Sequence, residues 1–159
     1  NQYGKDKAAA EKLTQEKLSD YAIIRTAQIY GVAGDLVRLV QRTLAVQEKF
    51  TAFSNLTNCP TWIEDLFEML NAIIINGYKG FFHCVGPEAV SRYQYACKIA
   101  DSLTLDASRI KAISLDFLND VRPSTVRLSG ALTYERLQFC AGSLEENLPA
   151  YCSSLIQST

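Results

Sequence analysis

Two residues near the start of the chain, Tyr3 and Lys7, have the types and the spacing that proton transfer to a carbonyl requires. Residues four apart lie on one face of a helix, and residues 3–18 are rich in Ala, Glu, Lys and Leu, which form helices readily. A tyrosine phenol ordinarily ionises at a pH of about 10, and a neighbouring ammonium favours its phenolate form. Such a pair can pass a proton to or from an oxygen during hydride transfer. Spacing alone also allows the alternative that both are ordinary exposed residues.

Short apolar strands alternate with helices after this first helix, and this alternation predicts an α/β fold. The run at 21–26 is typical of a buried parallel strand. Further strands are expected at 50–53, 80–85 and 110–115, and further helices at 35–44, 61–75, 91–103, 131–139 and after 143. At three expected helix starts a Ser or Thr is followed three positions later by Glu or Gln, the pattern of a capping box: Thr61–Glu64, Ser91–Gln94 and Ser143–Glu146.

Composition excludes several classes of function. The chain has 159 residues, of which 48% are hydrophobic and 10% aromatic, enough to build a core. A net charge of −1 gives no reason to expect nucleic acid or a membrane surface as a partner. The five cysteines show no C-x-x-C pair, which argues against a zinc site and a disulfide framework and favours a reducing cytoplasm. The single histidine, His83, and the single tryptophan, Trp62, are expected in the core.

Five segments follow one another in an informative order. They are Tyr3-Gly4 with Lys7 and Glu11, then Arg25 and Tyr30-Gly31; Cys59-Pro60-Thr61 with Asp65-Leu66; Gly80-Phe81-Phe82-His83; Ser91-x-Tyr93-x-x-Ala96; and Arg122-Pro123 with Leu128. This set resembles the extended short-chain dehydrogenase/reductase superfamily, and within it the dTDP-4-dehydrorhamnose reductases. The regulatory subunit of methionine adenosyltransferase shares the same segments.

The resemblance implies an NAD(P)-binding Rossmann domain and a smaller α/β lobe that binds a nucleotide sugar. By resemblance Tyr3 is the proton donor, and Lys7 holds the nicotinamide ribose and tunes the tyrosine. Arg25, Thr61 and Arg122 are expected at the substrate. For Arg25 the sequence leaves a second reading open, in which it pairs with a carboxylate, and Thr61 is equally explained as a helix-start residue.

The same comparison predicts that these residues are the C-terminal part of a longer reductase. No G-x-x-G-x-x-G segment occurs, so we expect NADP or NAD to be bound mainly by a missing N-terminal half and the fragment alone to be inactive. Residues 1–31 would be the remnant of the Rossmann domain. Residues 32–159 would be mainly the substrate lobe, with interleaved Rossmann elements. Without the missing half, the edge of the strand at 21–26 would need a partner chain, a second copy of this chain or a rearrangement to cover it.

Two other functions stay open at this point. A non-catalytic regulatory or binding protein is favoured by three departures from the reductase pattern, at Asp6, Gln28 and Asn55-Leu56. A nucleotide-sugar epimerase would use the same tyrosine and lysine.

Overall fold

The computed structural model describes residues 1–118 and 123–157 and has the α/β architecture that the sequence predicted. The α-helices are α1 (Gln2–Lys17), α2 (Leu36–Ala45), α3 (Ile63–Ile75), α4 (Arg92–Ser102), α5 (Ala131–Leu137) and α6 (Leu144–Gln157). The strands are β1 (Ala22–Arg25), β2 (Ile29–Tyr30), β3 (Phe50–Phe53), β4 (Thr57–Asn58), β5 (Thr61–Trp62), β6 (Gly80–His83), β7 (Val90–Ser91) and β8 (Ile110–Ile113). Two 3₁₀ turns flank β8, η1 (Ala107–Arg109) and η2 (Leu115–Leu118). Within the described residues, no helix is long and apolar enough to cross a bilayer.

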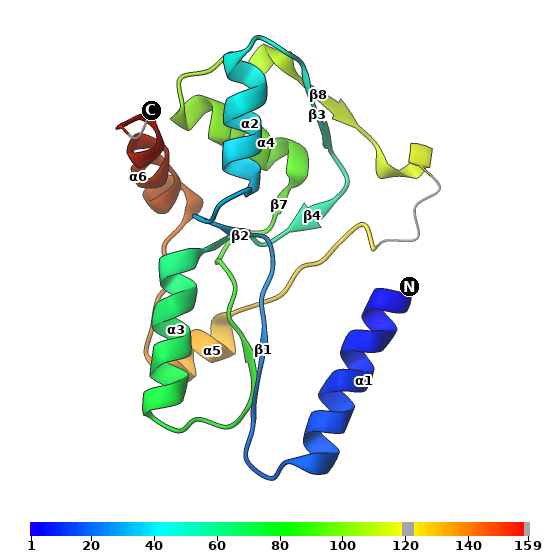
Figure 1. Ribbon diagram of the computed structural model, residues 1–159, viewed down its shortest axis with the longest axis vertical. Coiled ribbons are helices and arrows are strands. Elements are labelled where there is room, and N and C mark those ends of the chain that lie inside the picture. Colours follow the sequence, from blue (N-terminus) through cyan, green and yellow to red (C-terminus); the bar gives the residue numbers. More distant parts are fainter. Residues whose placement is uncertain (119–122, 158–159) are drawn as a thin grey trace.

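The molecule is elongated, and its upper half in Figure 1 contains α2, α4 and α6 with the parallel pair β3–β8. The core of this half is built from side chains with almost no exposed surface, among them Val37, Val40, Ile99 and Leu148. The helices of this half turn their apolar residues toward one another and toward the two strands. Burial of this surface, which stabilises by roughly 25 cal/mol per Å², therefore holds the upper half together.

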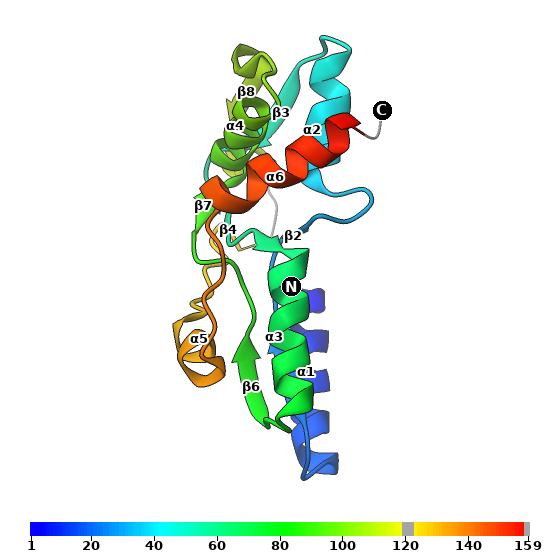
Figure 2. The ribbon, with the colours of Figure 1, turned by 90° about the vertical axis from the view of Figure 1, so that its left-hand side faces the viewer.

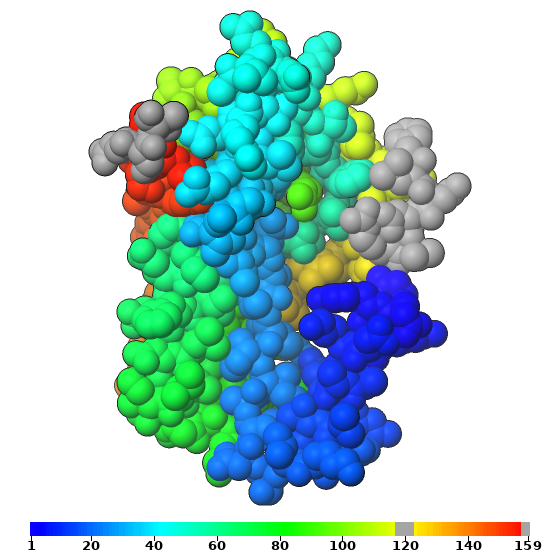
Figure 3. All heavy atoms as spheres, viewed as in Figure 1, coloured from blue at the N-terminus to red at the C-terminus, as the bar shows by residue number. Residues whose placement is uncertain are grey.

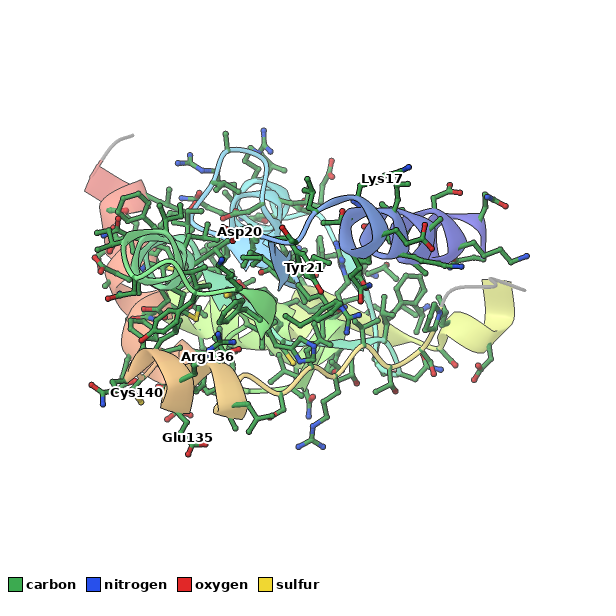
Figure 4. The ribbon with its side chains drawn as sticks, turned by 90° about the horizontal axis from the view of Figure 1, so that it is seen from below. Lys17, Asp20, Tyr21, Glu135, Arg136 and Cys140 are labelled. Atoms are coloured by element: carbon green, nitrogen blue, oxygen red, sulfur yellow. The ribbon has the colours of Figure 1, made fainter. Side chains whose placement is uncertain are left out.

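The lower half contains a second core, around the parallel pair β1–β6. Met69 of α3 and Phe82 of β6 are fully buried there, and Ile24 of β1 lies opposite Phe82 in the strand register. Figure 1 shows α3 and α1 on either side of β1, and Figure 2, turned by 90°, shows α1 behind α3. On α5, the Arg136 guanidinium lies 4.6 Å from the centre of the Phe82 ring, and Figure 4 shows this side chain turned inward while Glu135 points outward.

Two of the three expected capping boxes are present. The Ser91 hydroxyl accepts from the backbone N–H of Gln94, whose side chain accepts from the Ser91 N–H. Ser143 and Glu146 make the same exchange before α6. The expected cap at Thr61 is wrong, because Thr61 belongs to β5 and α3 begins after Trp62 without a side-chain cap. The segment between β3 and β5 also contains the short strand β4.

Trp62 packs between two tyrosines where the halves meet, as its expected core position requires. Its ring centre lies 5.1 Å from that of Tyr30 and 5.3 Å from that of Tyr151. Aromatic pairs at this separation add packing energy beyond the area they bury. Burial raises the pKa of the Tyr30 phenol well above its ordinary value, so this cluster stays uncharged.

Candidate functional site

The first helix presents Tyr3 and Lys7 on one face, as their spacing predicted. The helix begins at an Asn1 cap, whose side chain accepts from the Gly4 N–H at 2.8 Å. The Lys7 ammonium nitrogen lies 5.6 Å from the centre of the Tyr3 ring. Glu11 follows one turn later on the same face. A cation at this distance interacts favourably with the ring, so the pair is held together as a unit.

These side chains line a pocket of about 350 Å³ between α1, the end of β1 and the segment before α5. The lining residues are Tyr3, Lys7, Glu11, Ile24, Arg25, Thr26 and Leu128. Figure 3 shows the first turns of α1 standing off the body of the molecule, with a hollow beside them. Tyr3 has 72% of its surface exposed, so its phenol is accessible to a molecule in the pocket.

The structure brings Arg25 to the pocket but pairs it with a carboxylate. Its Nε donates to Glu11 Oε1 at 2.8 Å, and a terminal nitrogen donates to Oε2 at 2.6 Å. These hydrogen bonds hold the pKa of the Glu11 carboxyl below its ordinary value. Of the two readings that the sequence left open for Arg25, carboxylate pairing is the one observed.

Thr61 does not fit the expected role at the substrate. It has no exposed surface, and its hydroxyl donates to the Ala27 carbonyl (2.7 Å), lies 3.1 Å from the Cys59 carbonyl and accepts from the Gly86 N–H (3.2 Å). Because these partners are all backbone groups, the buried Thr61 hydroxyl joins β5 to two neighbouring segments and is fully hydrogen-bonded within the protein. Arg122, the third expected substrate residue, lies outside the described residues.

His83 is half-buried and hydrogen-bonded rather than enclosed in apolar core. Its Nδ1 lies 3.2 Å from the Ser129 carbonyl oxygen, and its Nε2 lies 3.4 Å from a nitrogen of Arg25. Neither a functional role for His83 nor the pairing of Glu11 was predicted from the sequence. The signal for Glu11 was its spacing, because it continues the four-residue series of Tyr3 and Lys7.

Metal and disulfide chemistry find no support in the part of the chain that the structure describes. No group of three metal-binding side chains occurs there. The five cysteines are free thiols. The chemistry available at the pocket is therefore that of a phenol, an ammonium and an Arg–Glu pair.

Parallel strands with flanking helices define an α/β protein, and the first helix beside these strands carries the Tyr–Lys pair. The chain belongs to the RmlD substrate binding domain family, whose model matches residues 1–156. The resemblance to dTDP-4-dehydrorhamnose reductases is thereby confirmed.

Known relatives match most of the length of this chain, but the chain spans less than half of the length of the curated relatives it matches. A dTDP-4-dehydrorhamnose reductase of Mycobacterium tuberculosis is 28% identical over 115 residues, which are 70% of this chain and 38% of the relative. Methionine adenosyltransferase 2 subunit beta of Bos taurus is 28% identical over 127 residues, 72% of this chain and 37% of the relative. The structure of dTDP-4-dehydrorhamnose reductase from Bacillus anthracis in complex with NADP superposes with a TM-score of 0.84 at 23% identity, covering 100% of this chain and 56% of that one. The likeness to this solved structure shows the fold alone.

Proposed function

We propose that the chain is the C-terminal portion of an NAD(P)H-dependent reductase that acts on a keto sugar linked to a nucleotide. The observation that carries the proposal is the position of Tyr3 and Lys7 on the wall of one open pocket, in a chain of this family. A phenol beside an ammonium suits proton donation to a carbonyl oxygen.

In the proposed reaction the chain supplies the proton. When bound, the nicotinamide cofactor supplies a hydride to the carbonyl carbon of the sugar. The Tyr3 phenol gives its proton to the carbonyl oxygen, so the ketone becomes an alcohol and the phenolate remains beside the Lys7 ammonium. That ammonium stabilises the phenolate by its charge and offers hydrogen bonds to hydroxyl groups such as those of ribose. The exposed phenol and the adjoining ammonium fit these tasks.

The remaining parts of the cofactor site would come from a Rossmann half outside these residues. We propose that residues 1–31 form the edge of that domain and that residues 32–159 form mainly the substrate lobe. We also propose that the protein is cytoplasmic. Among the described residues β1 pairs with β6 alone, which leaves its other edge open to a further strand. The missing half, in the same chain or a partner, or a second copy of this chain would cover that edge.

The test is NADPH oxidation by the full-length protein with a dTDP-linked 4-keto sugar. Tyr3→Phe removes the proton donor, and we expect the rate to fall by about 100-fold or more. Lys12→Met is the matched control, since Lys12 lies on the same helix with its side chain 78% exposed and pairs only with Glu16 among the described residues. Full turnover by Tyr3→Phe, or none by the wild type, would refute the catalytic assignment. Ordinary NADPH affinity of residues 1–159, measured by calorimetry, would refute the need for a further half.

A regulatory or binding protein on the same fold is the second candidate. The likeness to methionine adenosyltransferase 2 subunit beta favours it. Two departures from the reductase pattern also have structural roles here. Asn55 accepts from the Leu115 N–H (2.7 Å) and donates to Ser114 (2.9 Å), and Gln28 adopts a left-handed backbone, with its carbonyl accepting from the Thr61 N–H.

The activity assay also separates the remaining alternatives. A regulatory protein would show no NADPH oxidation in the wild type. An epimerase would interconvert sugar nucleotides without net consumption of NADPH.

A further inference from the structure

The first helix is fixed to the body of the molecule by very little apolar packing. Within α1, which is described in full, no residue is buried and just two, Glu11 and Thr14, are half-buried. The Thr14 hydroxyl bonds within the helix, to the Ala10 carbonyl. Leu13 is 54% exposed. Among the described residues, burial of apolar surface therefore does not set the orientation of this helix, although Tyr3 and Lys7 need a defined one to act in the pocket.

The Glu11 side chain makes the directed contact between this helix and the strands. Both of its oxygens accept from the guanidinium of Arg25 at the end of β1, at 2.8 and 2.6 Å. A bidentate pair of this kind restricts angle as well as distance. The Glu11 side chain is 25% exposed and that of Arg25 is 42% exposed, so the pair is partly screened by solvent.

Arg25 is in turn held by β6. Its guanidinium carbon lies 5.1 Å from the centre of the Phe81 ring. Its remaining terminal nitrogen lies 3.4 Å from His83 Nε2. Because the Ser129 carbonyl can only accept, the hydrogen of a neutral His83 ring belongs on Nδ1, and Nε2 then accepts from Arg25. One network thus joins α1, β1, β6 and the segment before α5.

We propose that Glu11 and Arg25 are positioning residues that dock α1 on the β1–β6 pair and so place Tyr3 and Lys7 at the pocket. The proposal rests on the proposed function for its catalytic consequence, but not for the docking itself. Tyr3, Lys7 and Glu11 occupy successive turns of one helix face, so the direction fixed at Glu11 carries along the helix to the phenol. Arg25 then serves the site through Glu11. Two of its three donor nitrogens face Glu11 and the third faces His83.

Hydrogen exchange of the backbone amides tests the docking in the 159-residue protein without any assay of turnover. Glu11→Gln keeps the shape of the side chain and removes its charge, and Glu16→Gln is the control, since the Glu16 side chain is 55% exposed and pairs with Lys12 within the helix. We expect Glu11→Gln to speed exchange across α1 by about fivefold, the factor for a partly exposed bidentate pair. Exchange in α4 should stay unchanged in both variants.

A double-mutant cycle tests the partner. If the pair docks the helix, Arg25→Met and the double variant Glu11→Gln/Arg25→Met should speed α1 exchange no more than Glu11→Gln alone does. The docking would be overturned if the effects of Glu11→Gln and Arg25→Met on α1 exchange were fully additive. It would also be overturned if α1 exchange in Glu11→Gln stayed within twofold of that in Glu16→Gln.

Kinetics of the full-length protein test the consequence at the site. Misplacement of the phenol should lower kcat by about tenfold or more, while KM for the sugar nucleotide stays within about twofold because both Glu11 carboxylate oxygens already accept from Arg25. A loosened helix with an unchanged kcat would overturn the positioning role and leave the proposed function standing. An inactive wild type would refute the proposed function, and the exchange experiment would still decide the docking.

Discussion

Replacing Gly86 by alanine is a sharp test of how the two halves meet. A methyl group built on Gly86 would lie 1.9 Å from the Pro60 carbonyl oxygen and 3.0 Å from the Pro60 carbonyl carbon. The atoms it meets belong to backbone, so no side-chain rotation relieves the clash. The Gly86 N–H also donates to the buried Thr61 hydroxyl. Alanine therefore forces the segments at 60 and 86 apart at the point where β5 leads into α3.

The size of the effect follows from this geometry. Carbon and oxygen atoms need about 3 Å or more between them, so the two segments must separate by about 1 Å. Overpacking of this kind costs about 1–3 kcal/mol. Loss of the hydrogen bond to Thr61 adds about 0.5–1.5 kcal/mol. We expect Gly86→Ala to lower the free energy of unfolding by about 1.5–4.5 kcal/mol in total.

Urea denaturation followed by tryptophan fluorescence measures this change, because Trp62, the single tryptophan, directly follows Thr61. Gly77→Ala is the matched control, since nothing lies within 4 Å of a methyl group there. Its cost is that of a left-handed backbone at φ +59°, about 1 kcal/mol. If Gly86→Ala unfolds within 0.5 kcal/mol of the wild type, or costs no more than Gly77→Ala, the inferred close approach of the two segments is wrong.

Three further predictions concern helix capping, thiol reactivity and the pH dependence of stability. Ser91→Ala removes the cap of α4 and should lower the free energy of unfolding by about 1 kcal/mol in urea; an unchanged midpoint would contradict the capping role. Of the thiols, exposed Cys140 should react with a disulfide reagent at pH 8 before buried Cys84 and Cys152, whose pKa values burial raises from 9.0 to about 11. Peptide mass spectrometry identifies the labelled sites, and equal rates would contradict the burial. Between pH 9 and 11 the unfolded chain releases these protons and the folded chain keeps them, so stability should fall as pH rises.

Local chemistry made much of the fold predictable from the sequence. A hydroxyl side chain and a carboxyl or carboxamide side chain three residues apart bond to the backbone of their own helix start, and the boxes at Ser91 and Ser143 form as expected. Thr61 shows the limit of the same pattern. Its hydroxyl donates to the backbone carbonyl of Ala27 at 2.7 Å and does not cap α3. Ala27 lies 34 residues away along the chain, and only folding brings it this close.

The site divides in the same way. The spacing of Tyr3 and Lys7 determined by itself that they share a helix face, because helical geometry depends on neighbours along the chain. Tertiary structure decided what that face meets. Glu11 pairs with Arg25, which lies 14 residues away on β1. Arg25 also contacts His83, which lies 58 residues away on β6. Leu128 reaches the pocket from the segment before α5. Many carboxylates compete for an arginine in an unfolded chain, and only the packing of strands and helices selects one. The sequence thus determined the chemical pair, and the fold decided where that pair points.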